Sequence, residues 1–232
     1  MSTKVIVSYD GTANEDDAVA LGRLFAQAGA EVSLAYVRHT PEPDSAREDL
    51  AQHEAQAMLA RGAQLLGRPE AKRHVVTDRS TPEGLAALAE REGADVVVFC
   101  SDSHTAKGHI AVGNSAERLL EGGRVAVAIA PVDLAESGNG SPIRKVVAVG
   151  DADGGARESA EALAAAFGAE VAPVINEDAG LLVIDSRPEA QEGRIAISSS
   201  AGRLVEMARC PVLVLPRGAK LRFGRTPAHA TA

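Results

Sequence analysis

The sequence contains no tryptophan and few other aromatic residues, with two tyrosines and four phenylalanines among 232 residues. A hydrophobic core must therefore consist mainly of alanine, valine and leucine. The chain also has only two cysteines, Cys100 and Cys210, and neither belongs to a CxxC or histidine-rich motif. Two isolated thiols provide neither a disulfide framework nor the ligands of a zinc site, so no structural metal is predicted.

Further absences narrow the class of protein. No run of about eighteen apolar residues occurs, so no membrane span is expected. The formal net charge is -8 and the basic residues are scattered, whereas nucleic-acid binding requires a basic stripe. The first residues enter an apolar segment directly, without the regions of a signal peptide. We expect a cytoplasmic protein with neither a membrane nor a nucleic acid as partner.

Short β-branched runs alternate with long segments rich in alanine, glutamate and arginine. We predict strands near 4–9, 31–37, 73–77, 95–100 and 124–130, and helices near 14–28, 44–66, 82–92 and 113–121. Runs such as "DVVVFC" are continuously apolar, which is typical of strands covered on both faces. The alternation predicts an α/β fold, with a parallel sheet and helices on both of its faces.

The chain also repeats itself. "KVIVSYD" at 4–10 matches "KVVAVGD" at 145–151, an offset of 141 residues. "AVGNSAERLLEGGRVAVAIAP" matches "AISSSAGRLVEMARCPVLVLP", which ends 85 residues later, at Pro216. The second copy is therefore about 56 residues shorter, and the loss lies between its second strand and "GLLVID". It keeps four strand-like runs in place of five.

These repeats predict a division of the chain into domains. A complete first domain covers 1–133 and a truncated second domain covers 143–216. Residues 134–142 between them carry the Gly, Asn, Ser and Pro of a linker. Residues 217–232 are basic and without periodicity, so we expect a flexible tail.

The sheet predicts where a ligand would bind. In an open parallel sheet, ligands lie beyond the carboxyl ends of the strands, where the strand order reverses. With an order of 2-1-3-4-5 or 3-2-1-4-5, that place is beside the first strand, which Asp10 follows. Asp10 could instead cap the next helix, although Thr12 and Asn14 are rival caps.

The loop after the fourth strand would form the opposite wall in the order 3-2-1-4-5. It places Gly113, Asn114 and Ser115 at the start of a helix. Unpaired backbone N–H groups and the positive end of the helix dipole favour an anion there. The same residues could also serve only as a helix cap.

These motifs resemble the universal stress protein family. "DGT" at 10–12 fits the family's first-strand motif, and "ADVVVFCSDSHTAKGHIAVGNSAERLLEGGRVAVAIAP" fits its fourth strand, glycine loop, helix and last strand. The resemblance implies a Rossmann-like sheet ordered 3-2-1-4-5, here in tandem. It also implies a non-catalytic stress-response module whose two copies pair antiparallel through 124–130 and 211–215 within one chain. A protein partner and a homodimer are further expectations.

The resemblance further implies an adenine ligand, ATP or AMP, in the first copy. In the family's ATP-binding members, the positions of Asp10 and of the Val37 backbone read adenine, and the glycine loop holds the phosphates. Here Cys100 and Ser103 replace two loop glycines, which adds Cβ atoms where backbone would approach phosphate. We therefore expect weak binding or none. The predicted site residues are Asp10, Gly11, Thr12, Val37, Cys100, Ser103, Gly113, Asn114 and Ser115.

The second copy departs further from the family's pattern, because the positions of the three loop glycines hold Asp185, Pro188 and Ser198. Asp185 and Glu189 bring negative charge to the phosphate position, so no nucleotide is expected there. The alternative function is a structural, partner-binding protein that has lost its nucleotide. A phosphatase of the haloacid dehalogenase type is a minor alternative, because "SYDGT" differs by one residue from that family's motif; its nucleophile position holds Ser8, expected to be buried.

Overall fold

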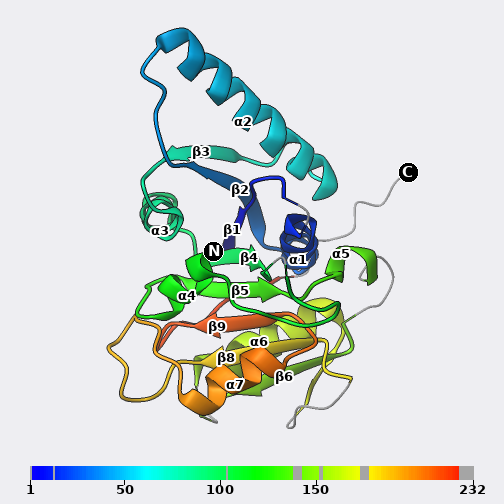
Figure 1. Cartoon of the computed structure of the whole chain (residues 1–232). Coiled ribbons are helices and arrows are strands. Elements are labelled where there is room, and N and C mark those ends of the chain that lie inside the picture. The colour runs from blue at the N-terminus through cyan, green and yellow to red at the C-terminus, as the bar shows by residue number, and fades with distance from the viewer. Residues whose placement is uncertain are drawn as a thin grey trace, which may run out of the picture.

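The computed structural model describes residues 2–12, 14–102, 104–137, 143–151, 154–172 and 178–224. In these ranges one sheet runs through the whole molecule, in the strand order β3-β2-β1-β4-β5-β9-β8-β6-β7. Helices cover both of its faces (Figure 1). None of the helices within the described ranges is long and apolar enough to span a bilayer.

The first copy has the predicted alternation of strands and helices. Its elements are β1 (Lys4–Ser8), α1 (Glu15–Gln27), β2 (Glu31–Arg38), α2 (Ser45–Leu65), β3 (Arg73–Thr77), α3 (Thr81–Glu92), β4 (Val96–Cys100), α4 (Asn114–Leu120) and β5 (Ala126–Ala130). All of its strand pairs are parallel. The predicted order 3-2-1-4-5 is confirmed.

The second copy is shorter. After α5 (Leu134–Ser137) come β6 (Lys145–Val149), α6 (Gly155–Phe167), β7 (Glu170–Ala172), β8 (Leu181–Asp185), α7 (Ser199–Met207) and β9 (Val212–Leu215). β5 and β9 pair antiparallel, with Val127 opposite Val214 and Ile129 opposite Val212. This is the pairing that the resemblance implied, and it removes two exposed strand edges.

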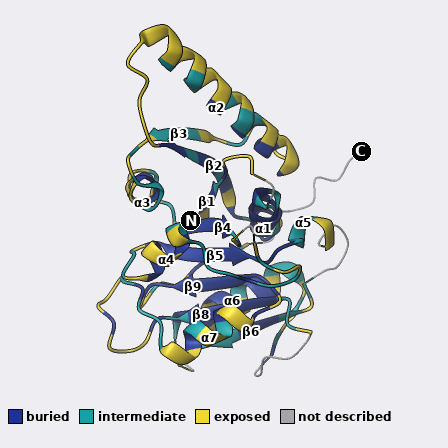
Figure 2. Cartoon of the chain, in the orientation of Figure 1, coloured by how far each residue is buried: buried dark blue, intermediate teal, exposed yellow. Residues whose placement is uncertain are grey.

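Small residues allow close packing in a core with few aromatics. One face of the sheet packs against α1, α2 and α6, and the other packs against α3, α4 and α7. A Cβ atom on Gly22 of α1 would lie 2.6 Å from Val7 Cγ2, and one on Gly62 of α2 would lie 2.7 Å from Leu34 Cδ2. Figure 2 shows the central strands buried, whereas α2 exposes most of its outer surface.

The expected linker is partly helical. Residues 134–137 form α5, which packs against α1. The buried carboxylate of Asp17 on α1 accepts hydrogen bonds from the N–H groups of Asp133 at 2.9 Å and Ala135 at 2.7 Å. The connection is therefore fixed to the first copy at its start. Residues 138–142 lie outside the described residues.

The first part of the expected flexible tail is ordered in the structure, because residues 217–224 pack against both copies. Leu221 is buried, and its N–H donates to Ser159 Oγ on α6 at 3.0 Å. The Phe223 ring stacks on Phe25 of α1 with centroids 5.9 Å apart. These two apolar side chains fasten the segment to α1 and α6. Residues 225–232 lie outside the described residues.

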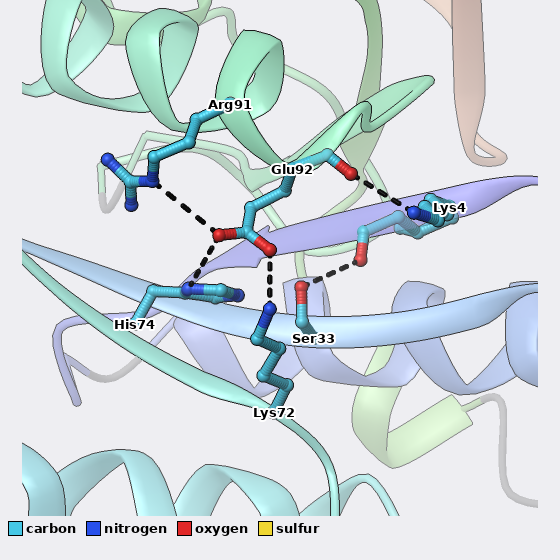
Figure 3. Close-up of polar contacts among 7 residues, drawn as sticks. Lys4, Ser33, Lys72, His74, Arg91 and Glu92 are labelled. Atoms are coloured by element: carbon cyan, nitrogen blue, oxygen red, sulfur yellow. Dashed lines mark hydrogen bonds and ion pairs between the residues drawn. The ribbon is translucent and has the colours of Figure 1, made fainter.

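A polar cluster around Glu92, at the end of α3, lies beside the amino ends of β1 and β3 (Figure 3). Its carboxylate pairs with Lys72 and lies 3.5 Å from Arg91 Nε and 3.9 Å from His74 Nδ1. The hydrogen bond from Lys72 lowers the pKa of Glu92, whereas burial lowers the pKa of His74. The cavity beside this cluster is only about 70 Å³, which leaves little room for a ligand at this edge.

Candidate functional site

A crevice opens beyond the carboxyl ends of β1 and β4. These strands are neighbours in the sheet, and the chain leaves them for opposite faces, to α1 and to α4. This is the topological switch point, where open parallel sheets bind ligands. The cavity has a volume of about 280 Å³. Its lining consists of Ser8, Asp10, Thr12, Asn14, Glu15, Thr81, Phe99, Cys100, Ser101, Asp102, Gly113, Asn114, Ser115 and Ala116.

The turn after β1, residues 10–12, is called the β1 turn and forms the first wall of the crevice. Asp10 Oδ1 accepts a hydrogen bond from Thr12 N at 2.9 Å, so Asp10 shapes this turn and does not cap α1. Gly11 has φ +79°, a conformation that favours glycine. The N-cap residue of α1 is Asn14, whose side chain makes no capping hydrogen bond. Its amide instead donates to Asp102 O at 3.3 Å and joins the two walls.

Glu15 is the principal residue that the sequence prediction missed. It opens α1 but points back to the β1 turn, where one carboxylate oxygen accepts hydrogen bonds from Gly11 N at 3.0 Å and from Asp10 N. Only 7% of the residue is exposed. Burial is the main cause that raises its pKa to about 8, against the opposing effect of the backbone hydrogen bonds. Much of the Glu15 population therefore holds a proton at neutral pH.

The loop after β4 forms the second wall. Cys100 ends β4, and burial raises the pKa of its thiol to about 12, so it carries no reactive thiolate. Next to it, Ser101 Oγ donates to Ala130 O at 2.7 Å and ties the loop to β5. Asp102 Oδ1 accepts a hydrogen bond from His104 N at 3.0 Å, which lowers the pKa of Asp102.

Of the two residues that replace loop glycines, Cys100 causes no backbone strain. Within the described ranges, Asp133 is the only non-glycine residue with positive φ. Cys100 therefore avoids the left-handed conformation, whereas Gly108 in the same loop has φ +73°. Gly113 has φ -74°, and nothing lies within 4 Å of the position of an added Cβ. Its missing side chain leaves open space at the start of α4.

The structure brings most of the predicted residues together, and six of them line the crevice: Asp10, Thr12, Cys100, Gly113, Asn114 and Ser115. Gly11 turns its N–H to Glu15. Val37 is buried and packs beside Gly84 of α3, outside the crevice lining. Ser103 lies outside the described residues. Ser8 is half-buried and lines the crevice, so the expectation that Ser8 is buried was wrong.

The corresponding place in the second copy is filled by the chain itself. Asp185 ends β8, as Cys100 ends β4, and its Oδ1 accepts a hydrogen bond from Ala156 N at the start of α6 at 2.8 Å. A Cβ atom on Gly154 would lie 2.1 Å from Asp185 Oδ2. Burial raises the pKa of Asp185 to about 6. The Asp185 side chain thus lies against the turn before α6.

Comparison with known proteins gives the family. The model of the universal stress protein family matches residues 1–131, which cover more than half of the chain. The chain belongs to the universal stress protein family. No curated protein matches it in sequence. The part of the chain that matches the universal stress protein model contains the whole crevice of the first copy.

Solved structures show that the fold likeness extends over both copies. A universal stress protein from Archaeoglobus fulgidus DSM 4304 is similar with a TM-score of 0.69 and 16% identity, over 94% of this chain and 100% of that chain. A functionally unknown protein from Pseudomonas aeruginosa PAO1 is similar with a TM-score of 0.59 and 14% identity, over 93% of each chain. At these identities the likeness concerns the fold alone.

Proposed function

We propose that this member of the universal stress protein family is a non-catalytic binding module of the stress response in the cytoplasm. It holds an adenine compound, weakly, in the crevice of the first copy. The observation that carries the proposal is the cavity of about 280 Å³ at the switch point between β1 and β4. Asp10 lies on one of its walls, and Asn114 and Ser115 lie on the other.

The polar groups in the crevice suit recognition of a purine nucleoside. Asp10 offers carboxylate oxygens, which accept hydrogen bonds from an amino group or a ribose hydroxyl. Asn114 and Ser115 each offer both a donor and an acceptor. Phe99 contributes an apolar side chain to the lining. A few polar groups beside apolar surface are typical of small-molecule sites.

The side chains of the crevice give little support for catalysis. The Cys100 thiol is held protonated by burial, which raises its pKa. The position of a phosphatase nucleophile holds Ser8 in place of a carboxylate. Within the described residues, no group of three His, Cys, Asp or Glu side chains could hold a metal ion. These three observations favour binding without turnover.

For the second copy, we propose that it completes the sheet and binds no nucleotide. Asp185 occupies the turn before α6 and would repel a phosphate. We propose the domain division as 1–133 and 143–216, joined by 134–142. In this arrangement the main contribution of the second copy is to cover β5.

The proposal is tested by denaturing the purified chain and searching the released small molecules for adenine compounds by mass spectrometry and ultraviolet absorbance. A thermal-shift titration with adenine compounds, including millimolar ATP with Mg²⁺, then measures affinity through ligand stabilisation. We expect weak, saturable binding. Affinity for ATP in the low micromolar range would contradict weak binding.

The second candidate is a structural, partner-binding member of the family that has lost its ligand. The observation that favours it is the acidic lining of the crevice, which includes Asp10, Glu15 and Asp102. It predicts that no adenine compound is released on denaturation and that none shifts the melting temperature.

A further inference from the structure

Apart from the start of α4, the described lining of the first copy's crevice offers no positive charge to a phosphate. Three acidic residues, Asp10, Glu15 and Asp102, belong to the described lining, and no lysine or arginine does. The pKa of Asp102 is lowered, so this residue is ionised at neutral pH. The His104 ring lies beside it, with Nδ1 3.4 Å from Asp102 Oδ1. A phosphate brought between these walls would meet Asp10 and Asp102, whereas the buried Glu15 largely holds a proton at neutral pH.

The backbone donors of the β1 turn are also occupied. Successive N–H groups in a turn commonly hold a phosphate. Here the N–H groups of Asp10 and Gly11 both donate to Glu15, and Thr12 N donates to Asp10 Oδ1. Glu15 accepts these bonds whether or not it holds a proton. An anionic ligand would have to displace this buried side chain to reach the amides.

We propose that the crevice selects uncharged adenosine over its phosphates. This inference rests on the proposed function, because it assumes that an adenine compound binds there. Adenosine presents donors on its amino group and ribose hydroxyls, which the oxygen atoms of Asp10, Asp102 and Asn114 can accept. Phosphates would add only acceptors and negative charge. The volume of about 280 Å³ lies just below the range of typical ligand sites, which is about 300–1,000 Å³.

The preference is measured by isothermal titration calorimetry of the full chain with adenosine, AMP and ATP, the last with and without Mg²⁺. At low salt we expect adenosine to bind at least about tenfold more tightly than AMP, because like charges a few ångströms apart repel each other. The ratio should shrink at high salt, where this repulsion is screened. AMP or ATP binding as tightly as adenosine would overturn the preference and leave the proposed function standing.

Two variants test which residues cause the preference for adenosine over AMP. Asp102→Asn removes a charge but keeps an acceptor for His104 N, so AMP affinity should rise several-fold while adenosine affinity changes less. Glu15→Ala frees the amides of Asp10 and Gly11, so it should also favour AMP. Glu117→Gln is the matched control, because Glu117 is exposed on α4 outside the crevice lining. It should leave the ratio of the two affinities unchanged.

The outcomes separate the two levels of the proposal. If adenosine, AMP and ATP all fail to bind at millimolar concentration, the proposed function is wrong, and the preference is wrong with it. If adenosine binds but neither Asp102→Asn nor Glu15→Ala narrows the gap to AMP, the assignment of selectivity to these residues is wrong. Circular dichroism of each variant verifies that the fold is intact.

Discussion

Glu15 should make the stability of the protein depend on pH. Burial raises its pKa from 4.5 to about 8 in the folded chain. Between these two values the folded state binds more protons at Glu15 than the unfolded state does, so the stability that Glu15 contributes is fully present below pH 4.5 and is lost as the pH rises to 8. At 1.36 kcal/mol for each pH unit between the two pKa values, the loss from this group reaches about 5 kcal/mol.

The variant Glu15→Gln isolates this effect. The amide introduced by this substitution would still offer an oxygen to the N–H groups of Asp10 and Gly11, but it does not titrate. We expect the unfolding free energy of the variant, relative to that of the parent chain, to rise steadily between pH 5 and pH 8.5. Urea denaturation at several pH values measures both curves by linear extrapolation.

The control is again Glu117→Gln, whose curve should run parallel to that of the parent chain. Parallel curves for Glu15→Gln and the parent would refute the reasoning, because they would mean that Glu15 titrates alike in the folded and unfolded states. A variant that loses stability relative to the parent as the pH rises would refute it more strongly. It would show that the folded chain favours the ionised carboxylate.

Three further predictions concern packing. Gly62→Ala places a Cβ 2.7 Å from Leu34 Cδ2 and should destabilise the chain by about 1–3 kcal/mol in urea denaturation. Gly113→Ala meets open space and should cost less than about 1 kcal/mol. Equal losses of stability for the two variants would contradict this prediction. Truncation after Pro216 removes the contacts of 217–224 and should lower stability by roughly 2–4 kcal/mol. Truncation after Gly224 keeps these contacts and should leave stability unchanged. Equal melting temperatures for the two truncated chains would show that 217–224 does not stabilise the fold. Deletion of 143–232 should uncover β5 and cause dimerisation or aggregation in size-exclusion chromatography; a monodisperse monomer would count against this.

The strands and helices of the first copy could be predicted because their signals are local. The continuous apolar runs are typical of buried parallel strands, and the bounds of the elements agree with the prediction to within two residues. The repeat gave the four strands of the second copy in the same way. Local periodicity and self-similarity do not depend on knowing how distant segments pack.

The missed features depend on how side chains and segments pack in the folded chain. An acidic residue in the first turn of a helix normally complements the helix dipole. The Thr-x-x-Glu spacing at 12–15 also matches a capping box, in which a glutamate reaches back to backbone N–H groups, but nothing in the sequence indicated that Glu15 would be buried. The segment 217–224 has no periodicity, and only the surface between α1 and α6 gives Leu221 and Phe223 their partners. The role of the Val37 backbone, inferred from a family position, stays a prediction, and its side chain packs against α3.

The contact between Thr3 and the segment 217–224 has a consequence for biosynthesis. Thr3 N donates to Arg222 O at 3.3 Å, and Arg222 N donates to Thr3 Oγ1 at 3.1 Å. A ribosome releases Arg222 and Phe223 only after both copies have been translated. A nascent chain that stops early therefore leaves the Phe25 ring without its stacking partner, although every residue of the first copy has already been translated.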